Sequence, residues 1–205
     1  MAKLSGFGKF FVNRSNERNS RRFFEAIRSH LTLDENSSCL ELGAGKGFLS
    51  YAVYEHSRPR RLVVTDYDPS QVEKAKRLFG IKLGTIPPNI EFRATDARAL
   101  PFENETFDAI FALMVLHHTE KKDWQFRNIP KALEEIRRVL RPGGVFCYTE
   151  LFSKNRIRNY LSKAGFQEVL GTRSYFFFDS CIYRKESQAL VRAHGPEDQP
   201  AYSVA

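Results

Sequence analysis

Three glycines alternate with other residues directly after a short apolar stretch, in the order Glu41-x-Gly43-x-Gly45-x-Gly47. Glycine has no Cβ atom, so a ligand can lie against bare backbone, and the N-terminus of a following helix directs its amide N–H groups at that ligand. A dinucleotide fingerprint, G-x-G-x-x-G, would require its third glycine at the position of Phe48, so that pattern fails. The turn therefore predicts close approach by a different cofactor.

Acidic residues and histidines follow the later apolar stretches. Asp66 ends one in VVTDYDPS, Asp96 follows another in TDARALPF, and His117 and His118 come after the apolar run 109–116. Carboxylate oxygens accept hydrogen bonds, and histidine exchanges a proton near neutral pH. Asp68 has a structural explanation, because Pro69 follows it and Gln71 completes a capping-box pattern at a helix start.

Alternating strands and helices position these residues. Apolar residues at helical spacing, from Phe23 through Phe24 and Ile27 to Leu31, predict an amphipathic helix ahead of the first strand. Buried strands are predicted at 39–42, 61–65, 90–94, 109–115 and 145–149, and a hairpin at 166–170 and 175–183. Helices are predicted at 48–54, at 69–80 with Gly80 as the stop, from 132 to the Arg141-Pro142-Gly143-Gly144 turn, and at 153–164.

This alternation predicts a single α/β domain with a doubly wound, mostly parallel sheet, which binds ligands at the carboxyl ends of its strands. We expect three segments. Residues 1–34 form a basic amphipathic helical cap or lid, residues 35–185 form the ligand-binding domain, and residues 186–205, which are poor in apolar residues, form a disordered tail.

In this order the motifs resemble those of class I S-adenosylmethionine (SAM)-dependent methyltransferases, in the type 11 group that includes the quinone-biosynthesis C-methyltransferases. The stretches TFDAIFALMVLHHTE and EEIRRVLRPGGVF also match that group, and the resemblance covers about residues 38 to 183. It implies a Rossmann-like fold with a seven-stranded sheet, antiparallel in its last strand, in a three-layer αβα arrangement. It also implies SAM as cofactor and S-adenosylhomocysteine as product.

The resemblance assigns roles residue by residue. The glycine turn receives the methionine part of SAM, Asp66 the ribose hydroxyls, and Asp96 and Ala97 the adenine, while Leu113 packs under the cofactor. The full set of cofactor-binding residues is Glu41, Gly43, Ala44, Gly45, Gly47, Asp66, Tyr67, Asp96, Ala97 and Leu113. Asp108 is expected to be a structural residue at a strand start.

Methyl transfer from a sulfonium is an in-line displacement, so the enzyme has mainly to position the reactants, and no metal is required. A base is needed only where the acceptor arrives protonated. His117 and His118 are the candidate catalytic residues for that role, and His117 is the one we expect to contact the site. The alternative, that they only line the pocket or bond a loop carbonyl, stays open.

The acceptor is expected to be a small or lipid-like molecule. The formal net charge is +8, and residues 1–31 hold seven lysines and arginines against two glutamates. This basic N-terminus, with Lys154, Arg156 and Arg158 on the short link after the fifth strand, could border an open site for an anionic surface, either a membrane or RNA. A solvated basic helix is the alternative. Two other functions remain open: an RNA or protein methyltransferase, and a catalytically idle SAM-binding subunit.

Composition indicates a cytoplasmic protein, with peripheral membrane attachment as an alternative. The longest apolar run has eight residues, at 109–116, whereas a spanning helix needs about 20. The basic start lacks the apolar core and cleavage site of a secretory signal. Cys39, Cys147 and Cys181 have no metal-type spacing and are expected to be reduced core residues. The oligomeric state is not predicted.

Overall fold

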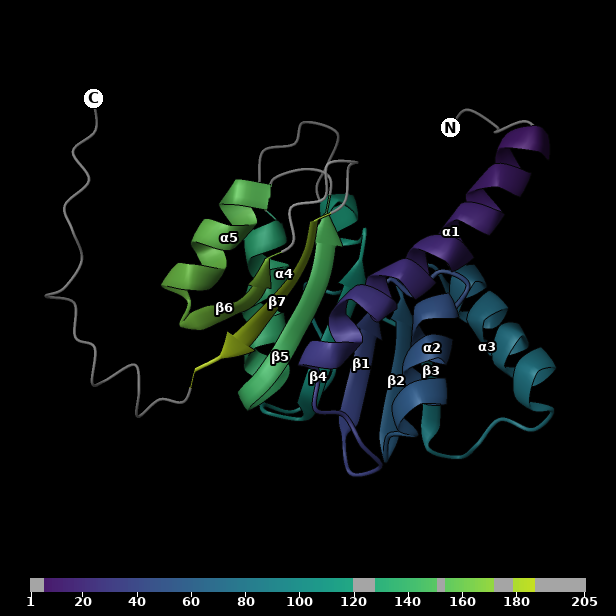
Figure 1. The fold of residues 1–205 in the computed structure, drawn as a ribbon, viewed down its shortest axis with the longest axis horizontal. Coiled ribbons are helices and arrows are strands. Elements are labelled where there is room, and N and C mark those ends of the chain that lie inside the picture. The colour runs from purple at the N-terminus through teal and green to yellow at the C-terminus, as the bar shows by residue number, and fades with distance from the viewer. Residues whose placement is uncertain (1–5, 120–127, 151–153, 172–178, 187–205) are drawn as a thin grey trace, which may run out of the picture.

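The computed structural model describes residues 6–119, 128–150, 154–171 and 179–186. Within these ranges the strands form a seven-stranded sheet in the order β3-β2-β1-β4-β5-β7-β6 (Figure 1). The strands are β1 (Ser38–Leu42), β2 (Arg61–Asp66), β3 (Ile90–Ala94), β4 (Phe107–Leu113), β5 (Leu140–Glu150), β6 (Phe166–Gly171) and β7 (Asp179–Lys185). β7 runs antiparallel to both of its neighbours, and the pairs among β1 to β5 are parallel. The predicted fold class is confirmed.

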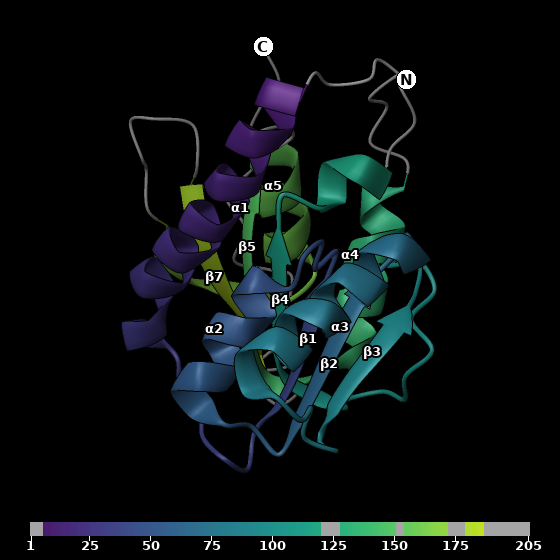
Figure 2. The same ribbon diagram turned by 90° about the vertical axis from the view of Figure 1, so that its right-hand side faces the viewer.

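Helices cover both faces of the sheet (Figure 2). They are α1 (Gly6–Ile27), α2 (Phe48–Ser57), α3 (Pro69–Leu83), α4 (Ile129–Val139) and α5 (Lys154–Lys163), with 3₁₀ turns η1 (Arg28–His30) and η2 (Leu116–Thr119). On one face, Phe24 and Ile27 of α1 join Leu49 and Phe79 in a buried cluster, so α1, α2 and α3 share that layer. On the other, Leu133 and Leu161 belong to the cluster that buries α4 and α5. The result is a three-layer arrangement.

The helix α3 departs from its predicted end. It continues through Gly80 to Leu83, and Gly84 rather than Gly80 has the positive φ, +73°, at its end. Leu83 packs against the buried cluster shared by α1, α2 and α3, and this contact stabilises the extra turn. Asp68 caps the helix by accepting from the N–H of Ser70 at 2.8 Å, as its predicted role requires. The predicted reciprocal bond from Gln71 is replaced: the N–H of Asp68 donates to Asp66 Oδ1 at 2.9 Å.

The predicted turn at Arg141–Gly144 is part of β5 instead. Leu140 pairs with Phe107 of β4, and the register shifts before Ala109 pairs with Val145, so an irregularity absorbs the Pro-Gly-Gly sequence within the strand. The guanidinium of Arg141 donates to Asp108 Oδ1 at 2.9 Å. Asp108 Oδ2 also accepts from the N–H of Ser38 at 2.7 Å, which confirms its structural role.

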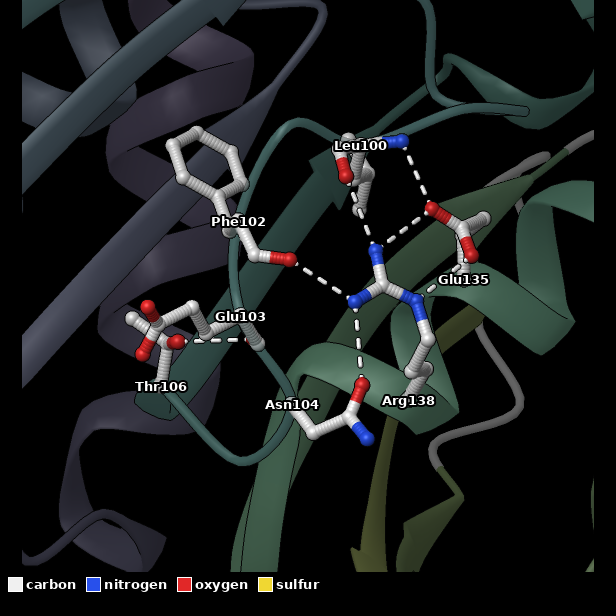
Figure 3. A network of polar contacts seen from close by, with 7 residues as sticks. All are labelled: Leu100, Phe102, Glu103, Asn104, Thr106, Glu135 and Arg138. Carbon is white, nitrogen blue, oxygen red and sulfur yellow. Dashed lines mark hydrogen bonds and ion pairs between the residues drawn. The ribbon is translucent and has the colours of Figure 1, made fainter.

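Arg138 of α4 holds the loop between β3 and β4, as Figure 3 shows. Its guanidinium donates to the carbonyl oxygens of Phe102 at 2.7 Å and Leu100 at 2.8 Å. Glu135 pairs with Arg138 at 2.7 Å and accepts from the N–H of Leu100 at 2.7 Å. A planar guanidinium with five donors suits several acceptors at once, so α4 fixes the loop that continues from Asp96.

Other sequence predictions have simple outcomes. Cys39, Cys147 and Cys181 are buried free thiols, as predicted. The strands β6 and β7 pair as the predicted hairpin, although the predicted start of the second strand at Tyr175 lies outside the described residues. The tail 187–205 also lies outside them. No helix in the described ranges is both long and apolar enough to cross a bilayer.

Candidate functional site

A cavity of about 820 Å³ lies where β1, β2, β3 and β4 end and the strand order reverses between β1 and β4. Doubly wound sheets bind ligands at such a reversal. Its walls come from six parts of the chain: Asn19 and Ser20 of α1; the turn Glu41–Lys46 with Phe48; Thr65–Asp68 with Gln71; Thr95–Arg98; Leu113–Val115; and His118–Thr119. A volume of this size is in the upper part of the range for small-molecule sites.

The glycine turn has a left-handed backbone at Gly43, Gly45 and Gly47. A Cβ atom on Gly43 would lie 2.5 Å from Cγ2 of Val115, so the absent side chain lets the turn pack against the chain after β4. A Cβ atom on Gly45 would meet nothing within 4 Å, which leaves its backbone open toward the cavity that Gly45 lines. Packing therefore explains Gly43, whereas Gly45 combines a positive φ with open space toward the cavity.

Asp66, at the end of β2, is tied to the glycine turn. Its Oδ2 accepts from the N–H of Gly45 at 2.9 Å, and its Oδ1 accepts from the N–H of Asp68. A carboxylate has about four acceptor positions, so two remain for a ligand. The neighbouring Tyr67 is 74% exposed and lines the same cavity.

Glu41 lies under the turn and is buried. Its Oε2 accepts from the N–H of Ser50 at 2.8 Å and from the Ser50 hydroxyl, so it acts as an acceptor for the first turn of α2. Burial raises the pKa of Glu41 to about 7, against the opposing effect of the bonds from Ser50. Glu41 therefore changes charge near neutral pH, at a point where it also lines the cavity.

Asp96 is engaged by Arg98. The side chain of Arg98 donates to Asp96 Oδ2 at 2.6 Å, and its backbone N–H donates to Oδ1 at 2.9 Å. The bonds from Arg98 hold the pKa of Asp96 below its usual value. Both residues and Ala97 line the cavity. A ligand that bonds to Asp96 therefore has to share its carboxylate with Arg98.

The chain turns sharply between β4 and η2. Met114 has φ +57°, an uncommon conformation for a residue other than glycine, and its N–H donates to the carbonyl of Thr149 at 2.9 Å. Such backbone positions cluster at functional sites. The turn brings Met114, Val115, His118 and Thr119 to the cavity wall.

The two histidines face different surroundings. His118 lines the cavity, and partial burial, followed by the neighbouring His117, lowers its pKa below 6.5. His117 is not among the lining residues; its ring points to Glu150, with Nδ1 2.6 Å from Oε2. The geometry thus presents His118 to a ligand, where the sequence favoured His117.

The predicted cofactor-binding residues gather at one cavity, except that Gly47 stands behind the turn, where a Cβ atom would lie 2.9 Å from that of Ala75. Sequence reasoning missed Asn19 and Ser20, because nothing marks which part of a long helix meets a distant strand end. It also missed Glu150, which ends β5 one residue beyond the predicted strand 145–149. Arg158 was expected near the mouth, yet its side chain contacts Cys181 at 3.5 Å on β7.

A family model described as a methyltransferase domain matches residues 40–148, just over half of the chain. The chain belongs to this methyltransferase domain family. Membership in this family implies that the domain uses SAM as its cofactor. It also confirms the methyltransferase family that the sequence motifs predicted.

Curated relatives share part of this methyltransferase domain. A sterol 4-C-methyltransferase of Caenorhabditis elegans is 30% identical over 129 residues, which are 63% of this chain and 35% of that protein. A ubiquinone/menaquinone biosynthesis C-methyltransferase of Hydrogenovibrio crunogenus is 34% identical over 116 residues, 56% of this chain and 42% of that protein. The chain spans less than half the length of these relatives.

Solved structures share the fold. A SAM-dependent methyltransferase from Aquifex aeolicus aligns with TM-score 0.64 and 19% identity, over 78% of this chain and 88% of that one. The [4+2]-cyclase SpnF aligns with TM-score 0.66 and 18% identity, over 83% and 80% of the two chains. The second likeness indicates that this architecture also occurs in a protein named for different chemistry.

The site fits SAM at two of its three parts. The open backbone at Gly45 can receive the amino-acid portion, and the two remaining acceptor positions of Asp66 match the two hydroxyls of a ribose. The position predicted for adenine, at Asp96 and Ala97, fits if Arg98 shares the Asp96 carboxylate with the ligand. Among the described residues, no cluster of three or more His, Cys, Asp or Glu side chains could hold a metal ion.

Proposed function

We propose that the protein transfers a methyl group from SAM to a small-molecule or lipid-like acceptor. The observation that carries the proposal is that one cavity of about 820 Å³ is lined both by the predicted cofactor motifs and by Met114, Val115, His118 and Thr119. Bound SAM would supply an electrophilic methyl group. The cavity extends beyond the cofactor motifs to His118 and to α1, which leaves a wall for the acceptor.

In this proposal the residues have distinct tasks. Gly43, Gly45 and Gly47 shape the turn, Asp66 binds the ribose, and Ala97 and Leu113 bound the cofactor on either side. The other predicted cofactor-binding residues that line the cavity are Glu41, Ala44, Tyr67 and Asp96. His118 takes the proton from a protonated acceptor, and His117 supports it from behind.

The acceptor class draws support from the names of the relatives. They include a sterol 4-C-methyltransferase, a quinone C-methyltransferase and a phthiotriol/phenolphthiotriol dimycocerosates methyltransferase from Mycobacterium leprae, which is 29% identical over 115 residues. Each of these names refers to a lipid-like molecule. An acceptor of that kind would approach past Asn19 and Ser20 of α1, consistent with the proposed cap role for residues 1–34.

The deciding experiment follows labelled methyl from SAM into a cell extract that is then separated into lipid, small-molecule, RNA and protein fractions. We expect label in the lipid or small-molecule fraction, and much less of it with the Asp66→Ala variant when SAM is held near the wild-type Kd. Label in RNA, with a salt-sensitive affinity, would instead support the basic N-terminus as an RNA surface. SAM binding without transfer to any fraction would contradict the proposal and favour an idle SAM-binding subunit.

A further inference from the structure

A buried carboxylate stands behind the turn that carries the two histidines. Glu150 is the last residue of β5, and its side chain is 0% exposed. Its Oε1 accepts from the N–H of Leu116 at 2.6 Å, and its Oε2 lies 2.6 Å from Nδ1 of His117. Burying a carboxylate is costly unless its oxygens are hydrogen-bonded, so these two short contacts account for its presence.

The contact with Leu116 fixes the backbone of η2, and the contact with His117 fixes a ring. Because a carboxylate accepts hydrogen bonds, the proton of this contact is assigned to Nδ1 of His117. The rings of His117 and His118 are 4.0 Å apart between centroids, with 42° between their planes. Glu150 therefore fixes the ring of His117, and that ring packs against the ring of His118.

His118 is the member of this group that meets the cavity. Its pKa is lowered by partial burial and by His117, while Glu150 and Asp66 act in the opposite direction. A lowered pKa keeps the ring neutral near pH 7, the form that can accept a proton. A catalytic base also has to be held in the right place, because small misplacements of reacting groups reduce rates strongly.

We propose that Glu150 is a positioning residue for proton transfer: through its bonds to Leu116 and His117, it fixes the ring of His118 in the cavity wall. This rests on the proposed methyl transfer, since a base is needed only for a protonated acceptor. In that step a proton moves from the acceptor atom to a ring nitrogen of His118. The electron pair stays on the acceptor atom and forms the bond to the methyl carbon, while the carbon–sulfur bond breaks with its pair on sulfur.

The test is the isosteric variant Glu150→Gln. Its amide oxygen can still accept from the N–H of Leu116, but its NH₂ group then faces Nδ1 of His117, which must become an acceptor. Glu168→Gln is the matched control. Glu168 accepts from the Tyr183 hydroxyl at 2.5 Å, on β6 and away from the cavity wall. Each variant is measured for SAM affinity and for methyl transfer into the extract fraction that the wild type labels.

We expect Glu150→Gln to lower kcat about tenfold or more while the Kd for SAM stays within about twofold, and Glu168→Gln to change neither. In ¹H–¹⁵N spectra of the wild type, the ring of His117 should carry its proton on Nδ1, and this signal should be lost in Glu150→Gln. A neutral wild-type ring protonated only at Nε2, or unchanged kcat in Glu150→Gln, would overturn the inference.

Failure of the proposed function would look different. If the wild type bound SAM but labelled no fraction, methyl transfer itself would be contradicted, whatever the spectra showed. If Glu150→Gln did not fold, the wild-type spectrum would still decide whether Nδ1 of His117 carries the proton. Equal losses of kcat in Glu150→Gln and Glu168→Gln would also overturn the inference, because they would indicate a general effect of removing a carboxylate.

Discussion

The Oδ2 atom of Asp66 accepts a hydrogen bond from the N–H of Gly45 at 2.9 Å, so the ends of β1 and β2 are joined through a side chain. The two cofactor motifs are separated by the whole of α2, yet they form one surface before any ligand is bound. The carbonyl of Thr65 reinforces the connection by accepting from the N–H of Ala44 at 2.8 Å. Such preorganisation reduces the cost of ordering the site on binding.

Replacing Asp66 with alanine should weaken SAM binding about tenfold to a hundredfold. Hydrogen bonds to charged groups contribute about 1.5–3 kcal/mol, and the variant also loses the bond to Gly45. Titration calorimetry measures the Kd. Asp34→Ala is the control: it removes a carboxylate that accepts from Asn36 and Ser37 away from the cavity lining, and it should leave the Kd nearly unchanged. An unchanged Kd in Asp66→Ala would show that the cofactor motifs have been placed in the wrong register.

Alanine at Gly43 and at Gly45 should separate packing from access. Both have positive φ, which costs about 1–2 kcal/mol for a residue with Cβ. At Gly43 the new Cβ would also overlap Val115, so we expect the larger loss of stability there, about 2 kcal/mol or more. At Gly45 the Cβ enters open space toward the cavity, so the loss of SAM affinity should exceed what the loss of stability explains.

Denaturant unfolding and SAM titration on the two glycine variants give the comparison. Stability losses of the same size at Gly43 and Gly45 would argue against the contact with Val115 as the reason for the first glycine. Normal SAM affinity in a folded Gly45→Ala variant would argue that no ligand approaches this part of the turn.

Glu41 makes a specific prediction for stability against pH. Its folded pKa of about 7 lies above the ordinary value of 4.5, because burial favours the protonated form. The folded chain therefore binds more protons than the unfolded chain between these values, and the contribution of Glu41 to stability is full below pH 4.5 and is lost as pH rises toward 7. The difference is on the order of 3 kcal/mol.

The measurement is the free energy of unfolding at pH 5 and at pH 7.5 for the wild type and for Glu41→Gln. Gln cannot ionise, so the variant should lose less stability over this range than the wild type does. Identical pH dependence in the two proteins would mean that Glu41 is ionised in the folded chain throughout the range, as it is in the unfolded chain. Because Gln preserves an acceptor for Ser50, the start of α2 should remain intact.

Much of this architecture was predictable because its signals are local. A strand buried on both faces, as at Leu62, is apolar throughout, and Asp68 with Pro69 marks a helix start in adjacent positions. The glycine turn and Asp66 were likewise found from short motifs whose order alone placed them at one edge of a sheet.

The relationships that complete the site are between distant positions, and no local pattern encodes them. Glu150 meets Leu116 across 34 positions, and Asn19 reaches a cavity formed by strands later in the chain. Which of His117 and His118 faces the cavity depends on the turn at Met114, where φ is positive. No local sequence pattern predicts a positive φ at that residue. Gly80 shows the converse: a residue that often ends helices is tolerated within α3 when Gly84 supplies the turn.

The pH dependence of methyl transfer should identify which histidine is the base. The pKa of His118 lies below 6.5, since partial burial and His117 outweigh the opposing effects of Glu150 and Asp66. A base acts in its neutral form, so kcat should stay level near pH 7 and fall as pH drops through that lowered pKa.

His118→Gln should lower kcat about a hundredfold or more and remove this acid limb, with the Kd for SAM nearly unchanged. His117→Gln should weaken activity less, because its ring supports the site from outside the cavity lining. The reverse order of effects would return the role of base to His117, and full activity in both variants would mean that the acceptor arrives without a proton to lose.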